Sequence, residues 1–232
     1  MKTAGIIGGI GPQSTIDYYR SIVALYRSRQ PDGSYPPVVI VSIDLQMVLG
    51  HVTAGRLDAL AAYIAAAIRK LAAAGADFAA MASNTPHIAF DLIAWSSPIP
   101  LISIVDAAAE EAKKRKLRRV GIFGTRATMT GSFYPDAFRH AGGISIIAPT
   151  EEEQGIVNEI YLNELVPGLF RDESRARLLD IVGRMKYRDH IDALALAGTE
   201  LPLILRAHEP PGVPFLDTAA IHVERIVDMM LS

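Results

Sequence analysis

Two segments of this 232-residue chain repeat one pattern. Residues 77–85 (DFAAMASNT) align without a gap with residues 192–200 (DALALAGTE), which begin 115 positions further along. Residues 5–8 (GIIG) recur as residues 121–124 (GIFG) at nearly the same offset, 116 positions. Each copy is an apolar run bounded by small or polar residues, which is the pattern of a buried strand. The repeat therefore predicts two copies of one α/β unit.

Apolar runs alternate with helix-period segments along the rest of the chain, which is typical of mainly parallel sheets flanked by helices. We expect strands at residues 3–8, 38–43, 78–82, 101–103, 120–123, 144–147 and 193–197. We expect helices at residues 57–74, 151–170, 174–185 and 217–231. Gly75 is expected to end the first of these helices, and Asp217 or Thr218 to cap the last.

The repeat also predicts a division into lobes. Residues 1–104 with 212–232 are expected to form lobe one, and residues 105–211 lobe two, with residues 208–214 crossing back between them. If the copies pack about a pseudo-twofold axis, Ser83 and Gly198 occupy equivalent strand ends. They would then face one another across an active-site cleft between the lobes.

Composition limits the partners and chemistry. The net charge is −2, so neither a nucleic-acid nor a membrane partner is expected. The N-terminus enters its first strand without an apolar stretch of signal-peptide length, which predicts a cytoplasmic protein. The absence of cysteine rules out disulfides, thiolate metal sites and thiol nucleophiles. The histidines show no metal-ligand spacing, so no metal or cofactor is expected.

A glycine-rich loop, residues 8–15 (GGIGPQST), follows the first strand and precedes a helix. Its backbone N–H groups could hold a carboxylate or phosphate, with Gly9, Gly11 and Thr15 as binding residues. Ser14 stands where the dinucleotide motif requires a glycine, and the Walker lysine is absent. A tight strand-to-helix turn would require the same glycines, so both interpretations stay open.

Polar side chains also follow the repeated strands. Residues 83–87 (SNTPH) place Ser83, Asn84, Thr85 and His87 at a strand end, where α/β sheets bind ligands. The alternative is a helix N-cap with His87 in solvent.

The second copy carries comparable residues. Thr199 and Glu200 hold the matching place, where the carboxylate could bind an ammonium group, orient a base or cap a helix. Thr125 and Thr128 stand in place of the glycine loop as candidate substrate-binding residues. Arg126 beside them could pair with a carboxylate, although we interpret it as a surface residue.

These residues resemble the aspartate/glutamate racemase superfamily along nearly the whole chain. The segments that carry the resemblance are residues 8–12 (GGIGP), 83–87 (SNTPH), 124–128 (GTRAT) with 133–134 (FY), 198–202 (GTELP) and 216–222 (LDTAAIH). The resemblance implies two pseudo-symmetric lobes, a homodimer and cofactor-independent chemistry on a small carboxylate or amino acid. In such racemases one cysteine from each lobe faces the substrate Cα, and one removes the proton while the other returns one.

The resemblance puts those two cysteines at Ser83 and Gly198. A serine hydroxyl is a far weaker base than a thiol, and glycine has no proton-transfer group, so the two-thiol mechanism is excluded. Three hypotheses remain. The chain is an enzyme that uses Ser83, His87 or Glu200 as acid or base, a carboxylate-binding or regulatory protein, or a racemase whose cysteines were replaced. Met47, His51 and Arg56 match no trusted motif for a distal carboxylate, so the substrate stays open.

Overall fold

The computed structural model describes residues 1–232, which form two compact units. Unit 1 comprises Met1–Ile104 and His222–Ser232, and unit 2 comprises Val105–Ile221. Residues 212–221, which we expected in lobe one, belong to unit 2. The reason is that strand β8 (Phe215–Asp217) pairs in parallel with β7 (Ala193–Ala197). The segment 208–214 therefore joins two elements of unit 2.

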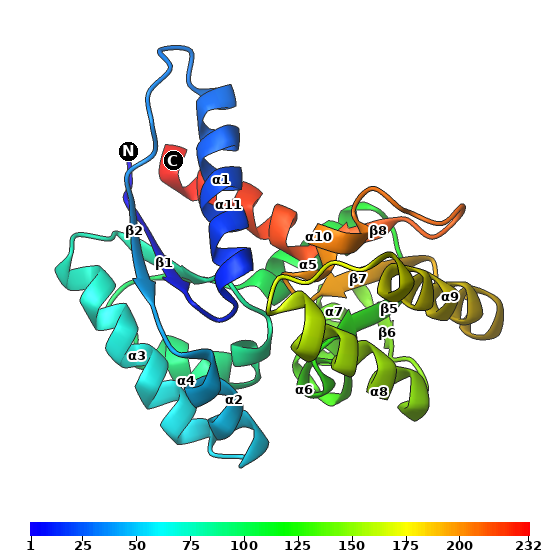
Figure 1. Ribbon diagram of the computed structural model, residues 1–232. Helices are drawn as coiled ribbons and strands as arrows, with labels where there is room; N and C mark the ends of the chain where they lie inside the picture. The colour runs from blue at the N-terminus through cyan, green and yellow to red at the C-terminus, as the bar shows by residue number, and fades with distance from the viewer. The chain divides into compact units, whose positions relative to one another are not determined.

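Unit 1 contains a four-stranded parallel sheet in the order β2-β1-β3-β4, of which β1 and β2 are labelled in Figure 1. Its strands are β1 (Ala4–Gly8), β2 (Val38–Ser42), β3 (Phe78–Met81) and β4 (Leu101–Ile102). Its helices are α1 (Pro12–Arg29), α2 (Leu45–Thr53), α3 (Leu57–Ala73), the 3-10 helix η1 (Thr85–Ala89) and α4 (Phe90–Trp95). The apolar face of α3, formed by Leu60, Ile64, Ile68 and Leu71, is completely buried.

Unit 2 repeats this arrangement with the order β6-β5-β7-β8, also all parallel. Its other strands are β5 (Arg119–Gly124) and β6 (Ser145–Ile147). Its helices are α6 (Arg126–Thr130), α7 (Phe133–Gly142), α8 (Glu151–Ile160), the π-helix η2 (Tyr161–Leu165), α9 (Asp172–Asp189) and α10 (Leu201–Leu205). Each strand of unit 2 takes the same place in its sheet as the strand numbered four lower in unit 1, so the predicted repeat is confirmed.

Two helices contain residues of both units. Helix α5 (Ile104–Lys114) begins at the last residue of the first segment, and α11 (Thr218–Leu231) starts in unit 2 and ends in unit 1. The Asp217 carboxylate accepts a hydrogen bond from the Ala220 amide at 2.9 Å, so Asp217 caps α11 as expected. In unit 1, α11 lies beside α1 (Figure 1), where Arg29 pairs with Asp228 at 2.5 Å.

The repeat extends to single hydrogen bonds at the strand starts. The Asp77 carboxylate accepts from the Thr3 amide at 2.6 Å in unit 1. Its counterpart Asp192 accepts from the amides of Arg118 and Arg119 at 2.8 and 2.9 Å. In both units an aspartate before the third strand therefore fixes the chain entering the first.

Two expected helix ends can be compared with the structure. Gly75 adopts φ +90° after α3, as expected for a helix stop. The single helix expected over residues 151–170 is α8 followed by η2, and it ends at Leu165. None of the helices combines the length and apolarity needed to cross a lipid bilayer.

Candidate functional site

The glycine loop of unit 1 uses its own polar groups to hold its shape. Gly9 has φ +83°, and a Cβ there would lie 2.3 Å from the Ile43 carbonyl oxygen. The Gly9 amide donates to Thr15 Oγ1 at 2.9 Å, and that hydroxyl donates to the Gly11 carbonyl at 3.1 Å. Ser14 donates to the same carbonyl at 2.9 Å. Thr15 therefore stabilises the turn, and the Gly9 N–H already has an acceptor.

The segment after β3 is a buried polar cluster. Ser83, Asn84, Thr85 and His87 are all buried, although each carries a polar side chain. No side chain caps η1, and His87 is only 3% exposed, so the capping interpretation with a solvated histidine is wrong. Buried polar groups that packing alone does not require are typical of a ligand site.

His87 is held as a neutral, backbone-anchored ring. Its Nε2 accepts a hydrogen bond from the Ile104 amide at 3.3 Å, so the proton of the neutral ring lies on Nδ1. The ring stacks on Phe90 with a centroid distance of 5.1 Å. Burial, with repulsion from His222, lowers the pKa of His87 to about 3, although the Ser83 and Asn84 carbonyls oppose the shift. The lone pair that a base would need is thus occupied by a backbone amide.

His222 belongs to unit 1, because α11 returns there. Its Nε2 lies 3.0 Å from the Ile102 carbonyl, which can only accept, so Nε2 carries the proton. Nδ1 therefore accepts from the Tyr18 hydroxyl at 3.0 Å. Burial lowers the pKa of His222 to about 4. The two histidines thus anchor the backbone on either side of Ser103.

In unit 2 the residues after β5 cap the short helix α6. Thr125 Oγ1 accepts from the Thr128 amide at 3.3 Å and lies 3.1 Å from Thr128 Oγ1. Arg126 is exposed, as expected for a surface residue, and its amide donates to Asn158 Oδ1 at 2.8 Å.

The segment after β7 places a carboxylate in the interior. Thr199 and Glu200 are completely buried, and Thr199 Oγ1 donates to Glu200 Oε2 at 3.2 Å. The Tyr161 hydroxyl donates to the same carboxylate oxygen. Burial, followed by the charge of Glu200, raises the pKa of Tyr161 well above 10.

Tyr161 also fills the space beside Gly198. A Cβ at position 198 would lie 2.4 Å from Tyr161 Cε2 and 2.9 Å from Cζ. Sequence reasoning did not single out Tyr161. It lies 39 positions before Glu200 inside an ordinary helical pattern, and no local signal marks its contact with the strand end.

Two further motif segments meet at β7. Thr218 Oγ1 donates to the Leu196 carbonyl at 2.8 Å, and the Thr218 side chain also bonds the buried Tyr134 hydroxyl. Burial raises the pKa of Tyr134, so its phenol stays protonated. Thr218 thus links the buried Tyr134 hydroxyl to β7, the strand that ends just before Gly198.

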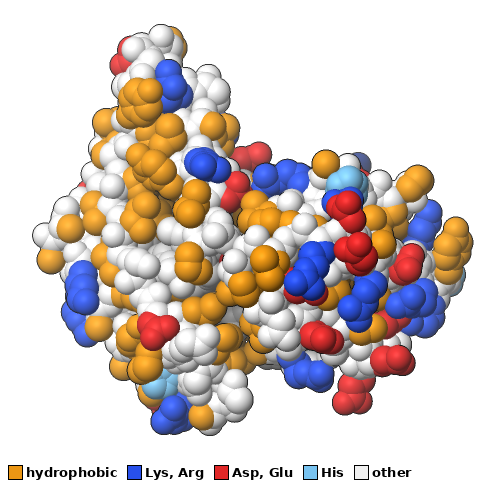
Figure 2. Space-filling view, in the orientation of Figure 1, with side chains coloured by type: hydrophobic (Ala, Val, Ile, Leu, Met, Phe, Trp, Pro, Cys, Tyr) orange, Lys and Arg blue, Asp and Glu red, His pale blue; other side chains and the backbone are white.

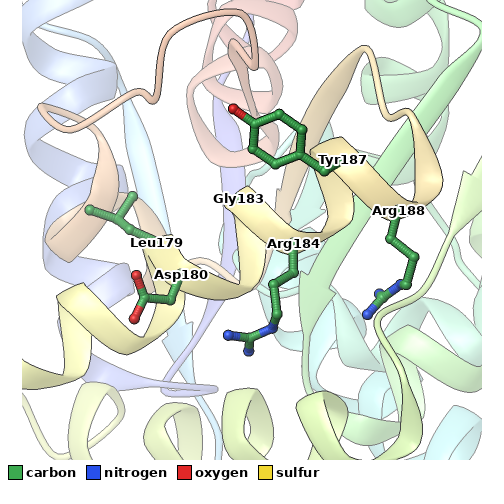
Figure 3. Close-up of a pocket in the computed structure, with 6 residues that line it drawn as sticks. All are labelled: Leu179, Asp180, Gly183, Arg184, Tyr187 and Arg188. Carbon is green, nitrogen blue, oxygen red and sulfur yellow. The ribbon is translucent and has the colours of Figure 1, made fainter.

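Neither a metal-binding cluster nor the surface hollow on α9 adds residues to this candidate site. No group of three or more His, Asp or Glu side chains is arranged to hold a metal ion. A hollow of about 680 Å³ on α9 is lined by Leu179, Asp180, Gly183, Arg184, Tyr187 and Arg188 (Figure 3). None of the predicted site residues lines it. Charged side chains gather over α8 and α9 on the face shown in Figure 2.

Comparison with known proteins gives consistent matches over the whole chain. The sequence model of the Asp/Glu/hydantoin racemase family matches residues 7–226. A broad-specificity amino-acid racemase of Bacillus subtilis (strain 168) is 23% identical over 239 residues, covering 98% of each chain.

Solved structures match over the full length of both chains. A candidate Asp/Glu racemase from Yersinia pestis is 29% identical with a TM-score of 0.88. An aspartate racemase homologue from Pyrococcus horikoshii OT3 is 31% identical with a TM-score of 0.84.

Proposed function

Because this chain belongs to the Asp/Glu/hydantoin racemase family, we propose that it binds a small acidic amino acid or dicarboxylate and transfers a proton at the ligand Cα. The reaction uses no cofactor and does not follow the two-thiol mechanism, since the sequence contains no cysteine. The observation that carries the proposal is the buried polar cluster Ser83, Asn84 and Thr85 directly after β3.

Ligand binding in this proposal draws on the buried polar groups that follow the repeated strands. Asn84 and Thr85 supply hydrogen-bonding groups after β3, and Thr199 is the proposed donor at the equivalent strand end of unit 2. Hydrogen bonds to a charged carboxylate are stronger than neutral ones, so a few such donors suffice to favour an acidic ligand. Ser83 is the proton-transfer group: its hydroxyl first gives its proton to water, and the alkoxide then takes the Cα proton and returns it from the regenerated hydroxyl. His87 already accepts the Ile104 amide, and Glu200 accepts from Tyr161 and Thr199. A serine hydroxyl is a weak base, so turnover is expected to be slow.

A thermal-shift titration tests the binding step. Aspartate, glutamate or citrate should raise the melting temperature, because a ligand that binds the folded state stabilises it. Asn84→Ala and Thr199→Ala should reduce the ligand-induced shift, whatever their effect on the ligand-free protein. Exposed residues of the same types provide controls, and Asn163→Ala and Thr130→Ala should leave the shift unchanged. A shift that survives in both Asn84→Ala and Thr199→Ala would contradict the proposed binding residues.

The second candidate function is binding without turnover. It is favoured by the hydrogen bonds that tie both Tyr161 and Thr199 to Glu200, since these groups hold one another in place. NMR of aspartate incubated with the protein in deuterated water separates the two functions. Loss of the Cα–H signal that depends on Ser83 supports proton transfer, whereas ligand binding with no exchange supports the binding protein.

We further propose that the chain is a homodimer, as the family resemblance implies. Sedimentation equilibrium across a concentration series measures this directly, and a mass near 25.1 kDa at all concentrations would contradict it.

A further inference from the structure

The Tyr161 side chain lies beside the end of β7, at a place where the repeat did not predict one. Position 198 is the place that resemblance assigns to the second cysteine, yet the ring of Tyr161 already occupies the adjoining space. We infer that Tyr161 closes this strand end, so that position 198 has no room for a proton-transfer group. The inference rests on the proposed function, and it identifies Tyr161 as the residue that keeps a proton-transfer group out of position 198.

The steric evidence is specific. Real Cβ atoms essentially never approach another heavy atom within 3.0 Å, and at position 198 both Tyr161 Cε2 (2.4 Å) and Cζ (2.9 Å) lie inside that limit. Leu201 Cδ1 follows at 3.2 Å. Any side chain at position 198 would therefore have to displace the aromatic ring.

The ring is fixed from several directions. Tyr161 belongs to the main apolar core of unit 2, and its hydroxyl donates to the buried Glu200 carboxylate. The π-helix begins at Tyr161, where the Val166 amide donates to the Tyr161 carbonyl at 3.0 Å, five positions away. Such local widening of a helix is often found at functional sites. The side chain is thus part of the packed core, and moving it would break a buried hydrogen bond.

The hydroxyl of Tyr161 does not replace the missing thiol. Its proton is donated to Glu200, whose Oε2 also accepts from Thr199. Loss of that proton would put a phenolate beside a buried carboxylate, which burial and like charge both oppose. Position 198 and Tyr161 therefore supply neither the acid nor the base that inversion would require there. Retention of the ligand's configuration is the expected outcome.

A set of variants at positions 161 and 198 tests the closure. Gly198→Ala adds only the Cβ that meets the ring. Tyr161→Leu removes Cε2 and Cζ but keeps an apolar side chain, and Tyr161→Phe keeps both atoms and removes only the hydroxyl. Tyr161→Phe is therefore the matched control, since it preserves the steric contact.

Gly198→Ala should lower the melting temperature by on the order of 5 °C in the wild-type background, because overpacking a core is destabilising. The same loss is expected in the Tyr161→Phe background, and it should nearly vanish in the Tyr161→Leu background. An equal loss in all three backgrounds would overturn the closure by Tyr161. Each Gly198→Ala variant differs by one methyl group from its parent, which is the wild type, Tyr161→Phe or Tyr161→Leu. The folding of each parent is checked before the melting temperatures are compared.

The stereochemical arm uses the wild-type protein with L-aspartate and with D-aspartate in deuterated water. Exchange of the Cα proton with retention of configuration supports the inference, and where no exchange occurs the variants at positions 161 and 198 carry the test. Formation of the opposite enantiomer would overturn it. The absence of any ligand-induced thermal shift would instead refute the proposed function, and the coupling between positions 161 and 198 would still be measurable.

Discussion

The buried histidines of unit 1 show how burial sets the protonation of single residues. His87 and His222 each bond a backbone group next to Ser103, one by accepting from Ile104 and the other by donating to Ile102. These opposite roles require one neutral tautomer at each position. Protonation of His87 would place a hydrogen on the nitrogen that now accepts the Ile104 amide, so the folded state resists it.

This arrangement predicts acid sensitivity. Both pKa values fall below the ordinary value of 6.5, to about 3 for His87 and about 4 for His222. Below pH 6.5 the unfolded chain therefore binds protons that the folded chain does not. The free energy of unfolding should fall by roughly 1.4 kcal/mol per pH unit for each histidine between pH 6 and 4.

Urea unfolding at several pH values measures this slope. His222→Gln keeps a neutral side chain and should remove about half of the slope between pH 6 and 4. His140→Gln, at an exposed position, serves as the control and should leave it intact. If the His222→Gln variant keeps the wild-type slope, the buried histidine is not the source of the acid sensitivity.

The residues of the candidate site differ in how far sequence could predict them. Ser83, Asn84, Thr85 and His87 are consecutive or nearly so after an apolar run, so their common position at a strand end follows from local pattern. Burial of His87 does not, because it depends on Phe90 stacking and on the Ile104 amide. The role of Tyr161 is still less predictable, since its contact with Gly198 exists only after η2 has packed against α10 and the residue that follows β7.

At the scale of elements, α8 and α9 are joined by one buried carboxylate. The helix α8 starts with a capping box, in which Thr150 Oγ1 accepts from the Glu153 amide at 3.3 Å and Glu153 accepts from the Thr150 amide at 3.0 Å. Glu153 also pairs with Arg184 at 2.7 Å and Arg188 at 3.0 Å. Figure 3 shows both arginines extending from the same side of α9.

Replacing this carboxylate should loosen the contact between the two helices. Burial raises the pKa of Glu153, but hydrogen bonds from Arg188, Arg184 and the Thr150 amide outweigh it and lower the pKa to about 2. Glu153→Gln should reduce the free energy of unfolding at pH 7 by about 2 kcal/mol, since it removes charge-assisted hydrogen bonds.

The pH dependence of this effect is part of the prediction. A lowered carboxyl pKa stabilises the folded state above pH 4.5, and that contribution disappears as the pH falls toward 2. The difference between Glu153→Gln and wild type should therefore shrink between pH 4.5 and 2 in chemical unfolding experiments. Glu152→Gln, at an exposed position of the same helix turn, should change little. Equal losses for the two variants would contradict a specific role for Glu153.

The strand that sequence analysis did not predict, β8, is defined by its hydrogen bonds to a neighbouring strand. The strand β8 has only three residues, Phe215 to Asp217, and a proline-containing loop precedes it. Its assignment depends on hydrogen bonding to β7, which no local pattern reports. The same pairing moves residues 212–221 from the expected lobe one into unit 2. The long strands β1 and β7, by contrast, follow directly from their apolar runs.

At the scale of the whole molecule, the repeat is the strongest link between sequence and structure. The matching sheet orders and the matching aspartates 77 and 192 show that both units follow one plan. The two strand ends have nevertheless diverged, because unit 1 presents Ser83 while unit 2 pairs Gly198 with Tyr161. The family mechanism uses one thiol from each half, so inversion should depend on changing both units together.

The combined variant Ser83→Cys, Gly198→Cys, Tyr161→Leu should therefore invert a small acidic amino acid. Inversion requires a base on one face of Cα and an acid on the other, so either thiol alone should be much less active. Tyr161→Leu is included because the ring would otherwise clash with any side chain at position 198. Chiral chromatography of aspartate and glutamate incubated with the protein measures the product.

The matched control replaces Ser83 by alanine while keeping Gly198→Cys and Tyr161→Leu. It contains the same reopened strand end with a single thiol, so any inversion beyond its level requires Cys in both units. Adding Gly198→Cys without Tyr161→Leu should give an unstable protein for the steric reason above. A triple variant could fold and bind aspartate, yet neither exchange the Cα proton nor form the other enantiomer. That outcome would show that the site differs from a two-thiol racemase site in more than the two thiols. That result would favour binding without turnover, because it would mean that the remaining polar groups no longer stabilise the deprotonated ligand.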